Sequence, residues 1–315
     1  MGIRRRCWTA IALYLLSLPG SQLTSANAMV LASGESGTNT ADPRIEPALN
    51  RIGIVNNGES GVYLGNSHGK SWVLTANHVG PGSFESGGIT YSAVAGSAHQ
   101  LLNPDSTLSD ILLFQINGDP RLSPLNLASA SPTNDTQVYM IGFGQSGRPN
   151  RSFWIDDGGP WIPTVAGDPA ANRIGYQWTG VQPGLERWGS GSVAGSTHGI
   201  NQTRAFYTKF LDQKKNACAT AGDSGGGVFI RLGDQWQLIG MLDALAGLTN
   251  QPAGTSVLNG EINVIADLSQ YRAQIDAHPV IVPEPPSLAS EAGEERDRSI
   301  NQDHRSGWPA ASRQK

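Results

Sequence analysis

The feature that most constrains the fold of this 315-residue chain is a series of short apolar runs, each ended by turn residues. From residue 52 onward the runs lie at 61–65, 71–75, 110–116, 137–144, 228–230 and 236–242. The last two flank Gly233-Asp234, which is typical of a hairpin turn. The chain also holds 39 glycines and 19 prolines, and only 15% of its residues are charged. This balance favours strands joined by turns over long amphipathic helices, and it predicts an all-β fold.

A helical period occurs only near residue 270. The apolar residues that fall on one helical face are Val264, Ile265, Leu268, Tyr271 and Ile275. Asp267 lies near the start of this segment, where a side-chain oxygen can cap a helix. We therefore expect one C-terminal helix after the strands.

The first 28 residues are typical of an export signal. Arg4, Arg5 and Arg6 form a positive start, and residues 8–18 form an apolar core that is too short to span a bilayer. Residues 26–28, Ala-Asn-Ala, supply a small-x-small cleavage site. This predicts a protein that is secreted or held in the cell envelope, without stable membrane insertion. An N-terminal membrane anchor is the alternative.

Two further segments lack a hydrophobic period. Residues 29–51 are polar, small and proline-bearing, and we expect a flexible leader or short propeptide there. Residues 279–315 are rich in Glu, Arg, Ser and Gln, which is typical of a disordered tail. The tail opens with Val-Pro-Glu-Pro, as some bacterial sorting signals do, but no hydrophobic helix and basic cluster follow in that arrangement. The folded domain is therefore predicted to span residues 52–278.

Cysteine content excludes an internal disulfide in the exported chain. The sequence has only Cys7 and Cys218, and Cys7 is lost with the signal. Stability must then come from burial of the core, which a chain of this length can provide. We interpret Cys218 as a buried, inert thiol, with a reactive thiol as the alternative.

Three motifs carry chemistry. Residues 221–227, Ala-Gly-Asp-Ser-Gly-Gly-Gly, place a serine on a glycine turn with backbone N–H groups beside its hydroxyl. A serine hydroxyl needs an adjacent base to become a nucleophile, and His78 after an apolar strand supplies an imidazole. Asp110 heads the apolar run at 110–116 and can orient that imidazole. Asp105, in a turn-like segment, is the nearest rival for this role.

Together these motifs resemble the chymotrypsin/trypsin-like serine peptidases over roughly residues 52–278. Residues 222–226 match the family's Gly-Asp-Ser-Gly-Gly, and residues 75–78, Thr-Ala-Asn-His, are similar to its Thr-Ala-Ala-His. Residues 110–114 match its Asp-Ile-Ala-Leu-Leu pattern in type. The resemblance implies two six-stranded antiparallel β-barrels with a C-terminal α-helix and the site between them. We place the barrel junction near residues 122–136.

The resemblance also implies a role for each matched residue. Ser224 would attack a peptide carbonyl, His78 would transfer the proton and Asp110 would hold the imidazole. The amides of Gly222 and Ser224 would form the oxyanion hole. In this family Asp223 usually pairs with a cation, which in animal members is a newly cut N-terminus. Cuts after Arg44 or Arg51 are conceivable but match the family's usual start poorly, so the activation step stays open.

The substrate pocket departs from the family pattern. Cys218 stands six residues before Ser224, where a pocket-floor carboxylate would favour Lys or Arg substrates. The segment Asp243, Ala244 and Leu245 falls near the family's Ser-Trp-Gly pocket wall, and an aspartate is unusual there. No cleavage preference follows.

Composition and the spacing of metal-binding residue types indicate which classes of ligand and partner to expect. The net charge is −4 without a basic stripe, which does not predict nucleic-acid binding. No His, Cys or Asp cluster has ligand spacing along the sequence, so no metal or organic cofactor is expected. We expect protein or peptide substrates, and the sequence leaves the oligomeric state undetermined.

Two other functions fit the same residues. The chain could be a catalytically silent, peptidase-like binding protein, although none of the three triad positions is substituted. It could also be an α/β-hydrolase esterase, in which Ser224 is followed in order by Asp243 or Asp267 and then His278. That fold requires a helix directly after the serine, and Gly225 onward predicts a strand instead.

Overall fold

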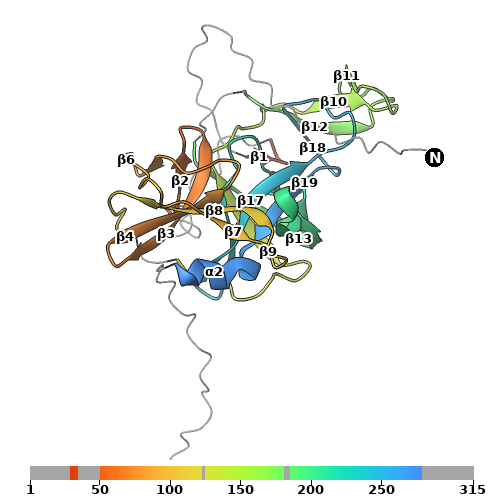
Figure 1. Ribbon diagram of the computed structural model, residues 1–315. Coiled ribbons are helices and arrows are strands. Elements are labelled where there is room, and N and C mark those ends of the chain that lie inside the picture. The colour runs from red at the N-terminus through yellow and green to blue at the C-terminus, as the bar shows by residue number, and fades with distance from the viewer. Residues whose placement is uncertain (1–28, 35–49, 123–124, 181–184, 279–315) are drawn as a thin grey trace, which may run out of the picture. The chain divides into compact units, whose positions relative to one another are not determined.

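The computed structural model describes residues 29–34, 50–122, 125–180 and 185–278 (Figure 1). The predicted export signal and the C-terminal tail therefore lie outside the described residues. In the part that is described, no helix is both long enough and apolar enough to cross a membrane.

The first half of the domain is an antiparallel sheet of seven strands in the order β6-β5-β2-β3-β4-β8-β7. Its strands are β2 (Ile52–Val55), β3 (Glu59–Ser67), β4 (Lys70–Ala76), β5 (Phe84–Ser86), β6 (Ile89–Tyr91), β7 (His99–Leu102) and β8 (Leu108–Ile116). The long central strands β3, β4 and β8 are buried over most of their length, whereas the edge strands are short. The sheet positions β4 and β8 side by side.

The second half is a closed barrel in the order β13-β14-β19-β17-β16-β9. Its strands are β9 (Gln137–Gly142), β13 (Arg187–His198), β14 (Arg204–Lys209), β16 (Gly227–Leu232), β17 (Gln235–Ala246) and β19 (Ile262–Asp267). β16 and β17 form the predicted hairpin, and Gly233 at its turn has a φ of 59°. Glycine takes this backbone conformation without the steric penalty that a Cβ brings.

The all-β prediction is confirmed, with a difference in the first half. The barrel of the second half has six strands, as expected, but the first half is a seven-stranded open sheet. Its edge strands β6 and β7 have three and four residues and pair with one neighbour each. These two edge strands do not pair with each other, so the sheet stays open.

Two small sheets complete the fold. One contains β10 (Ser152–Ile155), β11 (Ile162–Thr164), β12 (Arg173–Gln177) and β18 (Thr255–Val257), and the other contains β1 (Val30–Leu31) and β15 (Ala217–Cys218). β1 belongs to the segment that we expected to be a flexible leader. Met29, Val30, Leu31 and Ala32 are at most 5% exposed. The start of that segment is therefore packed, because its apolar side chains cover the residues around Cys218.

The C-terminal helical segment begins later than the apolar period indicates. Val264 and Ile265 lie in β19, and the helices are η2 (Leu268–Tyr271) and α2 (Arg272–Ala277), with a short η1 (Ile200–Gln202) elsewhere. The side chain of Asp267 accepts the amide of Ser269 and caps η2. The predicted C-terminal helix is confirmed, but the first residues of its apolar period lie in a strand, because a short apolar run cannot distinguish a buried strand from a helix.

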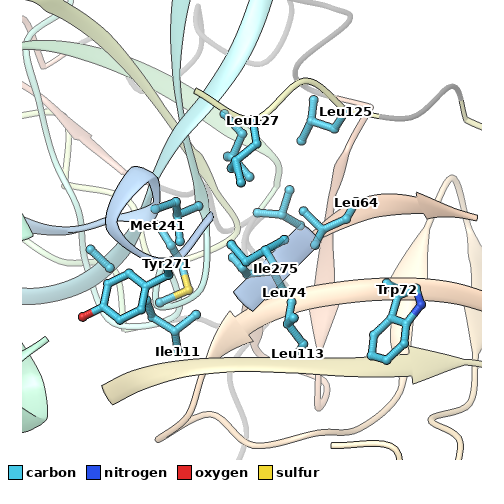
Figure 2. Packing of buried hydrophobic residues seen from close by; sticks show 14 of the residues in the cluster. Leu64, Trp72, Leu74, Ile111, Leu113, Leu125, Leu127, Met241, Tyr271 and Ile275 are labelled. Atoms are coloured by element: carbon cyan, nitrogen blue, oxygen red, sulfur yellow. The ribbon is translucent and has the colours of Figure 1, made fainter. Parts of the chain in front are cut away.

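One apolar cluster joins the sheet, the barrel and α2. Figure 2 shows Leu64, Leu74 and Leu113 of the sheet gathered with Met241 of the barrel and Ile275 of α2. All are at most 2% exposed. Burial of so much apolar surface in one cluster fixes the sheet and the barrel against each other.

We expect Val30→Asp to lower the free energy of unfolding by about 3 kcal/mol or more, because it places a charge in a dry cluster. Val165→Asp is the matched control, since Val165 is 72% exposed, and should change stability by about 0.5 kcal/mol or less. Urea unfolding measures both. Equal midpoints for the two variants would contradict the packing of β1.

Candidate active site

The pairing of β4 with β8 brings His78 and Asp110 into contact. Ala76 of β4 pairs with Ile111 of β8, so the next residue of the chain, Asn77, donates its amide to the Asp110 carbonyl at 3.0 Å. His78 follows and donates its backbone N–H to Asp110 Oδ1 at 2.9 Å. His78 Nδ1 lies 2.5 Å from Asp110 Oδ2. The register of two antiparallel strands therefore determines the contact.

The two side chains differ in exposure. Asp110 is fully buried, whereas 37% of the His78 side chain is exposed. A carboxylate accepts hydrogen bonds, so His78 Nδ1 carries the proton of their shared bond and Nε2 is left to accept one. The nitrogen that can accept a proton, Nε2, is thus the one that does not contact Asp110.

The pKa of His78 is raised above its ordinary value. Burial alone would lower it, but the hydrogen bond to Asp110, the charge of Asp110 and the charge of Glu59 all favour the protonated ring. Because the folded state binds this proton more tightly, the interaction stabilises the fold at acidic pH. That stabilisation is lost as the pH rises through the pKa of the folded state.

The turn that carries Ser224 is held by Ser60 of β3. Ser60 donates its hydroxyl to the Gly222 carbonyl at 2.8 Å and its amide to the Ser224 carbonyl at 3.0 Å. Thr75, three residues before His78, donates its hydroxyl to the Ser60 carbonyl at 2.8 Å. Ser60 therefore links β4, which ends just before His78, to the Ser224 turn. Within the described residues, no hydrogen bond joins Ser224 Oγ to His78.

Two glycines of this turn have left-handed backbone. The φ angles of Gly222 and Gly225 are 97° and 83°. A Cβ at Gly225 would also collide with the Ser60 carbonyl and the Thr75 hydroxyl. Only glycine fits both requirements, so the Gly-Asp-Ser-Gly pattern has a local steric cause.

Glu59 is a charged residue near this site that the sequence did not indicate. Burial raises the pKa of its carboxyl, while the charge of His78 and the amide of Gly222 act in the opposite direction. Glu59 therefore interacts with both His78 and the Ser224 turn. No sequence signal identifies it, because a glutamate before an apolar strand is ordinary.

Asp223 is fully buried behind the turn. Its carboxylate accepts hydrogen bonds from the Gly144 amide at 2.8 Å, the Thr220 amide at 2.8 Å and the Thr220 hydroxyl at 3.0 Å. Burial nevertheless raises the pKa of Asp223 to about 7. Two backbone amides and a hydroxyl thus donate hydrogen bonds to this carboxylate. The family resemblance had implied that a cation would pair with it.

The residues expected to line a substrate pocket lie in different surroundings. Cys218 is fully buried and pairs with Val30 of β1, and burial and the nearby Glu261 carboxyl raise the pKa of its thiol. Ala244 and Leu245 are partly buried in β17. Asp243 is only 1% exposed, and burial and the neighbouring Asp110 raise the pKa of its carboxyl. Cys218 and Asp243 are thus both shielded from solvent.

Within the described residues, the fold gathers one set of groups that can bind metals, which the sequence spacing did not reveal. One ligand atom from each of His78, Asp110 and Asp243 lies within 4.8 Å of the others. However, His78 Nδ1 and Asp110 Oδ2 are 2.5 Å apart. This separation leaves no room for an ion between them and is typical of a shared proton.

The esterase alternative does not fit this arrangement. After Ser224 the chain forms β16 and not a helix. His278 stacks on His99 with ring centroids 4.6 Å apart, and Asp267 caps η2. These groups are engaged elsewhere in the fold.

Comparison with known proteins gives one family. The model of the trypsin-like peptidase domain matches residues 59–241. No curated protein matches the sequence. The family match covers the Ser60, His78, Asp110 and Ser224 segments.

Solved structures show remote likenesses only. An inactive serine-to-alanine mutant of Rv3671c from M. tuberculosis H37Rv is 11% identical, with 79% of this chain and 97% of that chain covered and a TM-score of 0.44. A point mutant of human heparin binding protein (CAP37) is 17% identical, with 76% and 94% covered and a TM-score of 0.47. The atomic-resolution structure of heparin binding protein is 18% identical, with 77% and 95% covered and a TM-score of 0.46.

We expect Asp110→Asn to lower the pKa of His78, because the negative charge and the charged hydrogen-bond acceptor both favour the protonated ring and asparagine offers only a neutral acceptor. Glu59→Gln should lower it less, since Glu59 acts through charge alone. An NMR titration of the His78 ring measures both shifts. Asp105→Asn is the control, because Asp105 is hydrogen-bonded to Thr107 and not to His78. An unchanged His78 titration in Asp110→Asn would contradict the assigned contact.

Proposed function

Because this chain belongs to the trypsin-like peptidase family, we propose that it is a serine endopeptidase whose triad is Ser224, His78 and Asp110. The observation that carries the proposal is the contact between buried Asp110 and His78, which leaves His78 Nε2 free to accept a proton. A neutral imidazole held in this way is the general base that a serine hydroxyl needs.

In the proposed reaction, Ser224 Oγ forms a bond to the peptide carbonyl carbon while its proton passes to His78 Nε2. The carbonyl oxygen becomes an oxyanion, and the C–N bond then breaks as His78 gives that proton to the departing amine. Water repeats the sequence on the acyl-enzyme and releases the second product. Asp110 stays ionised throughout and stabilises the imidazolium.

The amides of Gly222 and Ser224 are proposed as the oxyanion hole. Loss of one such donor typically reduces transition-state stabilisation by about 3 kcal/mol. Support comes from the left-handed φ of Gly222 and from hydrogen bonds to the two carbonyls that share peptide units with these amides. The Gln145 amide donates to the Ala221 carbonyl at 3.0 Å, and the Gly226 amide donates to the Asp223 carbonyl at 2.9 Å. A turn held at its carbonyls has little freedom to rotate its amides away from a substrate.

We also propose that the protein is exported to the cell envelope or secreted, and that its substrates are proteins or peptides. The predicted cleavage site ends at Ala28, and Met29 is the first residue of the packed β1 segment. Cleavage after Ala28 would thus make the buried Met29 the new N-terminal residue.

A catalytically silent binding protein is the second candidate. One observation favours it: Cys218, at the expected pocket floor, is fully buried against Val30. A peptidase whose pocket is narrowed in this way would still bind substrates with small side chains, or would recognise its substrates at other subsites. Reactivity of Ser224 separates the two functions.

We expect a fluorophosphonate probe to label the wild-type protein and to leave Ser224→Ala unlabelled. His78→Ala should lower the labelling rate by about 10⁴-fold or more, because the general base is lost. Mass spectrometry of the labelled peptide identifies the modified residue. The matched control is Ser131→Ala, at an exposed serine. Labelling that persists in Ser224→Ala would refute the nucleophile, and a wild-type protein that stays unlabelled would favour the silent protein.

A further inference from the structure

Asp243 occupies a bulge in the barrel wall. The pairing of β17 with β19 shifts register between Leu242 and Ala244, so Asp243 is the extra residue. A bulge turns a side chain away from the regular alternation of the strand. The carboxyl is 1% exposed, and a Cβ at Gly199 would collide with its Oδ2. The space beside Gly199 thus accommodates the Asp243 carboxyl, and a side chain at residue 199 would not fit.

The two oxygens of Asp243 have different surroundings. Oδ2 accepts the Ile200 amide at 2.9 Å. Oδ1 is buried and accepts no hydrogen bond. The carboxyl lies against Asp110, and one ligand atom of each, together with one from His78, falls within 4.8 Å of the others. A buried oxygen without a donor, in a carboxyl that lies beside another carboxyl, is costly if both acids are ionised.

Protonation of one of the two acids removes the repulsion between them. The hydrogen-bond donors around each carboxyl determine which acid carries the proton. Asp110 accepts two hydrogen bonds from His78, one on each oxygen. Asp243 accepts one, on the oxygen that does not need a proton. Donors stabilise the ionised form, so Asp110 is the better anion of the pair.

We propose that Asp243 is a neutral carboxylic acid that donates a hydrogen bond to Asp110, and that it acts as a positioning residue for the Asp110–His78 pair. The part of this proposal that concerns reactivity rests on the proposed peptidase function. The proton placement does not. The donor fixes the Asp110 carboxylate and withdraws negative charge from it.

The electrostatics agree with the geometry. Burial and the contact with Asp110 raise the pKa of Asp243 to about 9. The groups that face it are Asp110 on β8, His78 after β4, the Ile200 amide of η1 and Tyr271 of η2. Asn103 accepts the Tyr271 hydroxyl hydrogen at 2.6 Å, so Tyr271 does not serve as the donor to the acid pair.

The first test is an NMR titration of the aspartate carboxyl carbons in the purified protein. We expect one resonance to titrate near pH 9 and to be missing from Asp243→Asn. The matched control is Asp234→Asn, in the β16–β17 hairpin, whose side chain is 99% exposed. If the Asp243 resonance titrates in the ordinary range of an aspartate, about 4, the proposal is overturned.

The second test compares fluorophosphonate labelling in two variants. Asparagine keeps an acceptor for Ile200 and an N–H donor for Asp110, so Asp243→Asn should label within about threefold of the wild type. Asp243→Ala leaves Asp110 without the donor and should label about tenfold more slowly or worse. If both variants keep native stability and lose labelling rate equally, the hydrogen-bond donor at residue 243 does not affect reactivity. That result would overturn the positioning role of Asp243. If Asp243→Ala does not fold, the titration and Asp243→Asn still decide the proposal.

The third test measures stability against pH. A carboxyl whose pKa is raised by folding stabilises the fold fully below its unfolded pKa, and this contribution is lost as the pH rises through about 9. The stability of Asp243→Asn relative to wild type should therefore increase between pH 5 and pH 9. A constant difference would overturn the proton placement. If the titration and stability results hold but no protein labels, the peptidase function fails and the proton placement stands.

Discussion

The buried carboxylate of Asp110 is the constraint on which the site depends. An ionised carboxylate without donors is several kcal/mol less stable in a protein interior than in water, so every neighbour must supply a hydrogen or tolerate the charge. The β4–β8 register supplies the two donors of His78. On the backbone side, the Asp110 amide donates to the Thr203 hydroxyl at 2.7 Å, and Thr203 donates to Ile200. The same η1 segment then gives the Ile200 amide to Asp243. One buried charge thus organises strands of the sheet and a loop of the barrel.

Ser60 has the corresponding role for the serine turn. It belongs to β3 of the sheet, yet it bonds to Gly222 and Ser224 of the barrel segment and accepts the Phe143 amide at 2.9 Å. The sheet and the barrel therefore share hydrogen bonds as well as the apolar cluster of Figure 2. Displacement of one half relative to the other would break both sets of contacts. This coupling holds together motifs that are about 150 residues apart in the chain.

The sequence predicted those parts of the structure that have a local cause. The strands, the Gly233 hairpin and the glycine turn follow from periodicity and from backbone conformations that only glycine adopts readily. It could not predict the position of Asp243, because a bulge between Leu242 and Ala244 redirects that side chain and no residue pattern encodes the bulge. It also did not predict that Val30 packs on Cys218, since four apolar residues at the start of a polar segment are too few to give a period. The influence of Glu59 on His78 likewise depends on tertiary contact alone.

The acids around His78 follow a common electrostatic logic. Burial raises the pKa of Glu59, that of Asp223 to about 7 and that of Asp243 to about 9. Glu59 interacts with both His78 and Asp223, so ionisation of one acid makes ionisation of the next less favourable. Asp110 differs from the other three because His78 supplies a hydrogen bond to each of its oxygens. His78 therefore contacts one carboxyl whose oxygens both accept its hydrogen bonds, and proton binding to the three other acids limits the negative charge that the site accumulates.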